Sequence, residues 1–153
     1  LVPGAEPEYT TENNINSLTL FSVIRQESMF EAEITSSQGA SGMMQILPAV
    51  GEEIAADYGW PANYSESDLI RPLVSVRLGA HYLTKWYNYF DKDMVAALAA
   101  YNGGIGNVIN WDSLAGSDPD LLLEIIPDNY ETQDYIRYIR ENLAIYETIY
   151  QRK

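Results

Sequence analysis

Signals that begin and end α-helices punctuate the chain at short intervals, and no segment sustains the two-residue alternation typical of a β-strand. Asn, Asp and Pro favour the first positions of a helix, whereas Gly favours the position just after its end. These signals predict helices from Asn16 onward, then over residues 48–58, 72–89, 94–101, a short segment through 111, 119–125 and 128–150. The sequence therefore predicts a mostly α fold, with at most a small β hairpin near residues 35–45.

Three of these boundaries carry specific local predictions. Asn16 is a good N-cap for the first helix. Asn102, which two glycines follow, is predicted to end its helix in the left-handed conformation. Glu131 lies three residues after Asp128, so a capping box at the start of the last helix is one structural interpretation of that carboxylate.

Composition excludes several classes of function. The chain has 153 residues, which suits one domain, and its 22 acidic and 9 basic side chains give a net charge of −13. Such a charge repels phosphate, so we expect no nucleic-acid partner. Cysteine is absent, which rules out disulfides and thiol catalysis, and the single His81 cannot supply a His-rich metal site. Asp91 begins a segment like a calcium-binding loop, but Ala96 and Asn102 occupy the positions of its Gly and Glu, so we predict no metal and no cofactor.

One carboxylate lies on the apolar side of the first helix. Leu20, Val23 and Ile24 form an apolar stripe at three- and four-residue spacing, and the same face continues to the next glutamate, Glu27. Desolvation against apolar surface favours the protonated form of a carboxyl group, so Glu27 is a candidate general acid. An exposed glutamate on the helix edge is the alternative. Glu31 follows one turn later, but a two-carboxylate glycosidase needs carboxyls that flank the sugar, and these two project from the same side.

Four short motifs then occur in order along the chain. They are Glu27-Ser28, Gly-Met-Met-Gln-Ile-Leu-Pro at 42–48, Ala-Tyr-Asn-Gly-Gly at 100–104 and Glu-Thr-Gln-Asp-Tyr-Ile at 131–136. The set resembles the motifs of the catalytic domain of the soluble lytic transglycosylases, whose fold is similar to goose-type lysozyme. The resemblance spans roughly residues 15–150 and implies a lysozyme-like helical domain with a substrate cleft. The chain departs from the family pattern at four positions, which are Met43, Leu47, Gly103 and Gln133.

The resemblance implies a peptidoglycan lytic transglycosylase. Such an enzyme cleaves the β-1,4 bond between N-acetylmuramic acid and N-acetylglucosamine. Glu27 would protonate the glycosidic oxygen and then deprotonate the C6 hydroxyl, which gives a 1,6-anhydro product. The resemblance also assigns substrate-binding roles to Ser36, Gln45, Leu47, Tyr101, Asn102, Glu131 and Tyr135. Structural alternatives are an ordinary loop hydroxyl for Ser36, an amide that holds the loop together for Gln45, and core packing for the two tyrosines.

Other functions stay open from the sequence. They are a muramidase on the same fold, a non-catalytic peptidoglycan-binding module and a helical interaction domain. We expect residues 1–14 to be an irregular lead-in and residues 15–153 to form the catalytic domain. No apolar run is long enough to cross a membrane, and the chain carries no targeting signal. The resemblance implies peptidoglycan glycan strands as the partner, a location in the bacterial cell envelope, a monomer, and an N-terminal helical region in the full-length protein.

Overall fold

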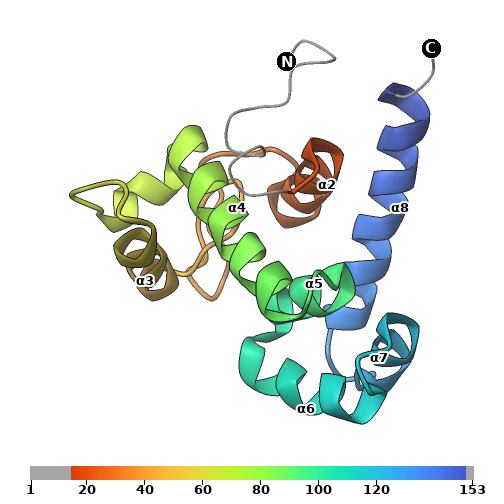
Figure 1. Cartoon of the computed structure of the whole chain (residues 1–153). Coiled ribbons are helices and arrows are strands. Elements are labelled where there is room, and N and C mark those ends of the chain that lie inside the picture. The colour runs from red at the N-terminus through yellow and green to blue at the C-terminus, as the bar shows by residue number, and fades with distance from the viewer. Residues whose placement is uncertain (1–14, 151–153) are drawn as a thin grey trace. The chain divides into compact units, whose positions relative to one another are not determined.

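The computed structural model describes residues 15–150, which fold into α-helices and one 3₁₀-helix (Figure 1). In chain order the elements are α2 (Ser17–Ser28), α3 (Pro48–Tyr58), the 3₁₀-helix η1 (Glu66–Ile70), α4 (Pro72–Tyr89), α5 (Met94–Gly103), α6 (Ile105–Ala115), α7 (Pro119–Ile125) and α8 (Thr132–Tyr150). Among the described residues there is no β-strand, and only isolated bridges join Thr35 to Ser41 and Ser41 to Ile46. None of the described helices is both long and apolar enough to cross a membrane. The predicted mostly α fold is confirmed, and the lead-in expected at residues 1–14 lies outside the described residues.

The chain divides into two compact units. Among the described residues, unit 1 comprises residues 15–82 and 142–150, and unit 2 comprises Leu83–Glu141. The predicted site residues fall into both units. Unit 1 holds Glu27, Ser36, Gln45 and Leu47, and unit 2 holds Tyr101, Asn102, Glu131 and Tyr135.

Helix α2 forms as its sequence predicts. The apolar stripe of Leu20, Val23 and Ile24 is buried, with exposed fractions of 2% or less. The Asn16 side chain accepts a hydrogen bond from the Leu18 N–H at 2.7 Å, which satisfies one of the backbone donors left open at the helix start. Burial of this stripe anchors the helix that carries Glu27.

Helices α3 and η1 pack against each other in unit 1. Pro48 begins α3 and Tyr58 is its last residue, as predicted, and Gly59 follows in the left-handed conformation. The sequence analysis missed η1, although Ser65 and Asp68 stand at the spacing of a capping box. The structure contains that box, with the Asp68 carboxylate accepting the Ser65 N–H at 2.9 Å.

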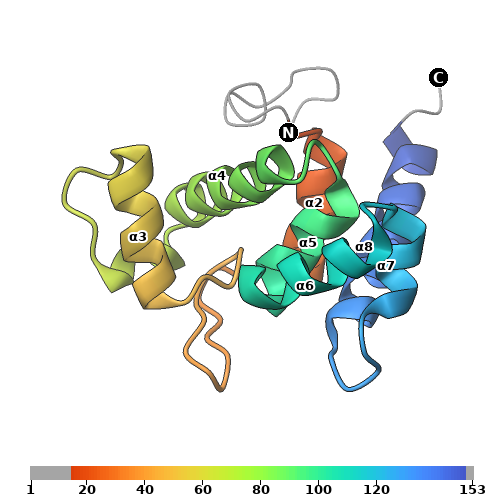
Figure 2. The same ribbon diagram turned by 60° about the horizontal axis from the view of Figure 1, so that its bottom comes forward.

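Helices α5, α6 and α7 pack against one another in unit 2 (Figure 2). Five consecutive residues of α5, 96–100, are buried, as expected for a helix that is apolar on all sides. The Asp93 side chain caps α5 by accepting two backbone N–H groups. Asp118 caps α7 in the same way, and Pro119 is its first residue, as predicted.

Three predicted boundaries are wrong. The helix predicted to run through residue 111 continues to Ala115. Asn102 lies inside α5, and the residue with positive φ that follows the helix is Gly104, at φ 80°. Glycine has no Cβ to clash in this conformation, so Gly104 can adopt it just after Gly103, the last residue of the helix. Helix α8 begins at Thr132 rather than near Asp128, because a hydrogen-bonded turn occupies the preceding residues. The interpretation of Glu131 as part of a capping box with Asp128 is therefore wrong.

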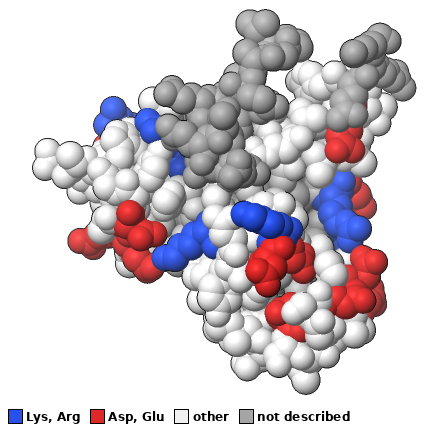
Figure 3. All heavy atoms as spheres, in the orientation of Figure 1, with Lys and Arg blue, Asp and Glu red and all other residues white. Residues whose placement is uncertain are grey.

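Charged side chains of both signs are interspersed on the face seen in Figure 3. Within unit 2, Arg137 lies 3.7 Å from Glu124, and Arg140 lies 3.9 Å from Asp120. These partners are largely exposed, and exposed ion pairs contribute little to stability. The fold therefore depends on its apolar core and helix caps more than on surface charge.

Candidate active site

Glu27 lies in the last turn of α2, one residue before the helix ends at Ser28. Its side chain is half-buried, and the helix residues that precede it on the same face are part of the core. The chain then turns through two consecutive residues with positive φ, Met29 at 53° and Phe30 at 67°. Both are exposed, at 64% and 43%. Glu27 is thus followed at once by an exposed apolar turn, which the sequence analysis did not predict.

A tight loop over residues 41–46 carries Gln45. Ser41 and Ile46 exchange backbone hydrogen bonds of 3.0 and 3.1 Å, which closes the loop. Gly42 has φ +79°, and a Cβ on it would stand 1.8 Å from the Leu69 carbonyl oxygen, so only glycine fits. Gln45 itself has φ 45°, a conformation that non-glycine residues adopt only where the surroundings hold them. The loop is therefore strongly constrained by its own backbone.

The Gln45 side chain contributes to this constraint. Its Nε2 donates to the carbonyl oxygens of Gly42 at 2.9 Å and Ile34 at 3.2 Å. An amide nitrogen has two hydrogens to donate, and both are directed at the loop backbone. Recognition of a ligand by Gln45 would then use the Oε1 oxygen, which accepts a hydrogen bond. The Nε2 group of Gln45 therefore holds the loop together, as the structural alternative predicted, whereas Oε1 has no such role in these two bonds.

Two buried serines tie this loop to the helices on either side. The Ser28 Oγ donates to the Met43 carbonyl at 2.9 Å, and it also lies 3.2 Å from the Ile24 carbonyl. The Ser75 Oγ of α4 accepts the Met44 N–H at 3.1 Å. Because Ser28 follows Glu27 directly, the first bond fixes the end of α2 relative to the loop that carries Gln45. No role for either serine was predicted from the sequence.

The other two candidates of unit 1 are on its surface. Ser36 is exposed, and its Oγ accepts the backbone N–H groups of Gln38 at 3.3 Å and Ala40 at 3.1 Å. The hydroxyl hydrogen of Ser36 can still be donated to a ligand. Leu47 immediately precedes α3 and is 42% exposed, so its side chain presents apolar surface.

The candidates of unit 2 group around the start of α8. Asn102 Oδ1 accepts a hydrogen bond of 2.7 Å from the buried Thr132 Oγ1, the first residue of α8. Glu131 directly precedes Thr132 and has an exposed side chain. Asn102 is therefore held next to the backbone of Glu131, and Tyr101 beside it is half-buried. Tyr135 is 6% exposed, which favours a packing role for most of its ring.

The single histidine is engaged within unit 1. The His81 ring stacks on Tyr58 with centroids 4.5 Å apart, and its Nε2 lies 3.6 Å from the Asp57 carboxylate. Across residues 15–150, no group of three or more His, Asp or Glu side chains is arranged to hold a metal ion. Unit 1 contributes a half-buried carboxyl group at Glu27, an amide at Gln45 and an exposed hydroxyl at Ser36.

Comparison with known proteins decides the family. Residues 5–123 match the family described as Transglycosylase SLT domain. The chain belongs to the transglycosylase SLT family. The soluble lytic murein transglycosylases of Salmonella typhimurium and Escherichia coli K12 are each 30% identical to this SLT chain over 145 residues. These matches cover 94% of this chain and 22% of each relative, so the chain spans about a fifth of their length.

Solved structures of the SLT family share the fold. The 70 kDa soluble lytic transglycosylase of Escherichia coli matches 92% of this chain with a TM-score of 0.85 at 30% identity. The lytic transglycosylase Slt of Pseudomonas aeruginosa, solved as an inactive mutant with Gln in place of one Glu, matches the same share with a TM-score of 0.82 at 34% identity. This chain covers 23% of each of those chains. The resemblance drawn from the four motifs and the predicted lysozyme-like fold are both confirmed.

Proposed function

We propose that this SLT chain is the catalytic part of a peptidoglycan lytic transglycosylase. Glu27 is its only catalytic acid and base, and the product is a 1,6-anhydro sugar. The observation that carries the proposal is a half-buried Glu27 at the end of α2, tied through Ser28 to the constrained loop of Gln45. Two observations on similar proteins support it: the relatives from Salmonella typhimurium and Escherichia coli are named murein transglycosylases, and the Pseudomonas aeruginosa lytic transglycosylase Slt is inactive as a Glu-to-Gln mutant.

The reaction needs one carboxyl group in two protonation states. Glu27 first donates its proton to the glycosidic oxygen, the bond from C1 to that oxygen breaks, and the alcohol leaves. The carboxylate of Glu27 then takes the proton of the C6 hydroxyl as its oxygen bonds to C1, which restores the acid. Because the attacking hydroxyl belongs to the same sugar, its effective concentration far exceeds that of a dissolved nucleophile. No water is consumed.

The remaining residues of unit 1 bind the sugar in this proposal. Gln45 accepts through Oε1 from the N–H of an acetamido group, and Ser36 donates its hydroxyl hydrogen. Leu47, Met29 and Phe30 offer exposed apolar surface for the faces of sugar rings. In unit 2 the substrate-binding residues are Tyr101, Asn102, Glu131 and Tyr135.

The proposed substrate implies where in the cell the protein acts. We propose glycan strands of peptidoglycan as the partner and the bacterial cell envelope, periplasmic or extracytoplasmic, as the location. The relatives named murein transglycosylases are bacterial, which supports this setting. We also propose that the protein acts as a monomer and that the full-length protein has an additional N-terminal helical region.

Mass spectrometry of digested sacculi tests the proposed function. Transglycosylation gives muropeptides that are lighter by one water than the products of hydrolysis. The proposal predicts that these anhydro products predominate. Reducing-end products would instead support a muramidase. Binding to sacculi without any soluble product would support a non-catalytic binding module, and neither binding nor product would leave a helical interaction domain.

A further inference from the structure

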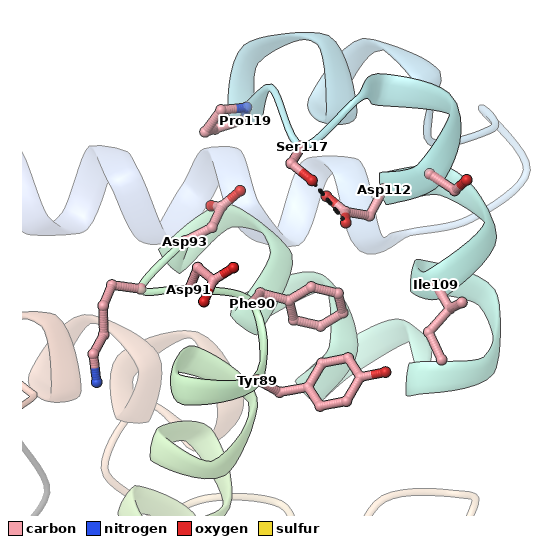
Figure 4. Close-up of a pocket in the computed structure, with 10 residues that line it drawn as sticks. Tyr89, Phe90, Asp91, Asp93, Ile109, Asp112, Ser117 and Pro119 are labelled. Atoms are coloured by element: carbon pink, nitrogen blue, oxygen red, sulfur yellow. Dashed lines mark hydrogen bonds between the residues drawn. The ribbon is translucent and has the colours of Figure 1, made fainter.

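Unit 2 contains a cavity that none of the residues assigned to bond cleavage lines. It has a volume of about 560 Å³ and lies among the end of α4, the turn that follows it, α6, and the connection from α6 to α7 (Figure 4). Small-molecule sites in proteins typically have volumes of a few hundred to about a thousand Å³. The cavity is therefore large enough for one sugar ring or a ligand of similar size.

One side of the cavity is apolar. The rings of Tyr89 and Phe90 meet edge to face with centroids 5.0 Å apart, and in Figure 4 both extend toward Ile109. Tyr89 is 59% exposed and Ile109 is 45% exposed. A ligand that covers large apolar side chains around a cavity removes them from water, which contributes favourably to the free energy of binding. This side therefore offers exposed apolar surface, formed by the Tyr89 ring and Ile109.

The opposite side presents hydrogen-bond acceptors. Asp91 and Asp112 line the cavity, and the Ser117 hydroxyl donates to the Asp112 carboxylate at 3.3 Å. Asp93 also lines it. One Asp93 oxygen caps α5, the other is buried without a hydrogen-bond partner, and burial raises the pKa of this carboxyl. The lining thus carries more acceptors than donors and disfavours an anionic ligand.

The one basic side chain of the lining, Lys92, is already engaged. Its ammonium donates to the side-chain oxygen of Asn88 and lies 5.3 Å from the centre of the Tyr87 ring. The ligand itself must therefore supply most of the hydrogen-bond donors. A pyranose ring combines an apolar face of C–H groups with a rim of hydroxyl donors, which matches the two sides of this cavity.

We propose that this cavity is a second glycan-binding site, which takes a neutral pyranose unit with its apolar face on Tyr89 and Ile109 and its hydroxyls donating to Asp91 and Asp112. Such a site would hold a glycan strand at a point other than the one being cleaved. The proposal does not depend on Glu27 or on the reaction that the chain performs.

The test is a ¹⁵N NMR titration of the 153-residue chain with the trisaccharide of N-acetylglucosamine. The proposal predicts saturable shifts of the backbone amides of Ile109 and Ser113, which line the cavity. Tyr89→Ala is expected to weaken the binding that these amides report by about tenfold, from the lost ring contact. Tyr138→Ala is the matched control, because Tyr138 belongs to the same unit, is 50% exposed and does not line the cavity.

Three results would overturn the proposal. The first is that the cavity amides stay unshifted at saturating sugar. The second is that Tyr89→Ala and Tyr138→Ala weaken binding equally. The third is that 1,5-diaminopentane shifts the same amides at lower concentration than the sugar. The last result would make the cavity an amine site. Because the shifts are read at the cavity itself, they are independent of whether the chain cleaves peptidoglycan.

Discussion

Replacement of Ser28 by Ala tests whether the bond between α2 and the Gln45 loop positions the site. Ser28 is 4% exposed, and its hydroxyl is the donor that reaches the Met43 carbonyl at 2.9 Å. Its removal leaves the part-buried Met43 carbonyl without that donor, which costs about 1 kcal/mol of unfolding free energy. Because the loop is then free to shift relative to Glu27, we also expect kcat to fall by about tenfold or more.

Ser22 provides a matched control in the same helix. It is fully buried, and its Oγ donates to the Leu18 carbonyl at 2.7 Å, four residues earlier in α2. That carbonyl also accepts the backbone N–H of the helix ladder, so Ser22→Ala leaves no orphaned acceptor and should cost about 0.5 kcal/mol or less. Ser22 lies in the helix interior, where Ser to Ala also gains helix propensity, so this variant should lose the least stability.

The assay compares the two variants in urea denaturation and in sacculus digestion. The difference in unfolding free energy between Ser28→Ala and Ser22→Ala should be about 0.5 kcal/mol or more, with equal m-values. Only Ser28→Ala should lose kcat. Equal midpoints and equal kcat for the two variants would refute the idea that this hydroxyl positions Glu27 against the loop.

Four further outcomes are expected. Gly42→Ala forces a Cβ against the Leu69 carbonyl at 1.8 Å, and denaturant titration should show a loss of about 3 kcal/mol or more; a smaller loss would mean that the loop yields. Ser75→Ala removes the acceptor of the Met44 N–H, so hydrogen exchange at that amide should accelerate. An unchanged exchange rate would show that this hydrogen bond does not protect the amide. The hydrogen bond from the Ser65 N–H, and after it the one from Arg71, lower the pKa of Asp68. The ionised Asp68 therefore stabilises the fold above the ordinary Asp pKa, and this stabilisation is lost as the pH falls from that value through the lowered pKa. Asp68→Asn should lower the unfolding free energy at neutral pH and reduce its fall in acid, whereas parallel curves of unfolding free energy against pH for the two proteins would contradict the assignment. With a net charge of −13, binding to a wall that also carries carboxylates gains nothing from long-range attraction, so turnover should change little with added salt, and a steep fall would argue against binding through local contacts.

Helix boundaries that depend on neighbouring residues could be predicted from the sequence. The side chains of Asn16, Asp93 and Asp118 bond backbone groups two or three positions ahead, so their role is visible in a short window. Where competing local signals overlap, the prediction failed. Asn102 can end a helix, but the glycine at 104 takes that role, and the helical Asn102 is left to bond Thr132 instead.

The arrangement of the candidate site could be predicted only in part. Glu27 was found because its apolar neighbours repeat along one helix face, which is a local pattern. The bond from Ser75 to Met44 joins residues 31 positions apart, and no periodicity reveals such a contact. A loop-holding role for Gln45 could be considered from the sequence, but its two acceptors could not be named, since they depend on how the loop folds back on Ile34.

The central claim is that Glu27 is the proton donor, and Glu27→Gln tests it most directly. The control is Glu31→Gln, which neutralises an exposed carboxylate just beyond the end of α2. Turnover of sacculi and binding to sacculi are measured for both variants. We predict that Glu27→Gln binds glycan strands but releases no anhydro product, while Glu31→Gln resembles the unmodified chain in both measurements. Release of anhydro product by Glu27→Gln at an undiminished rate would contradict the account.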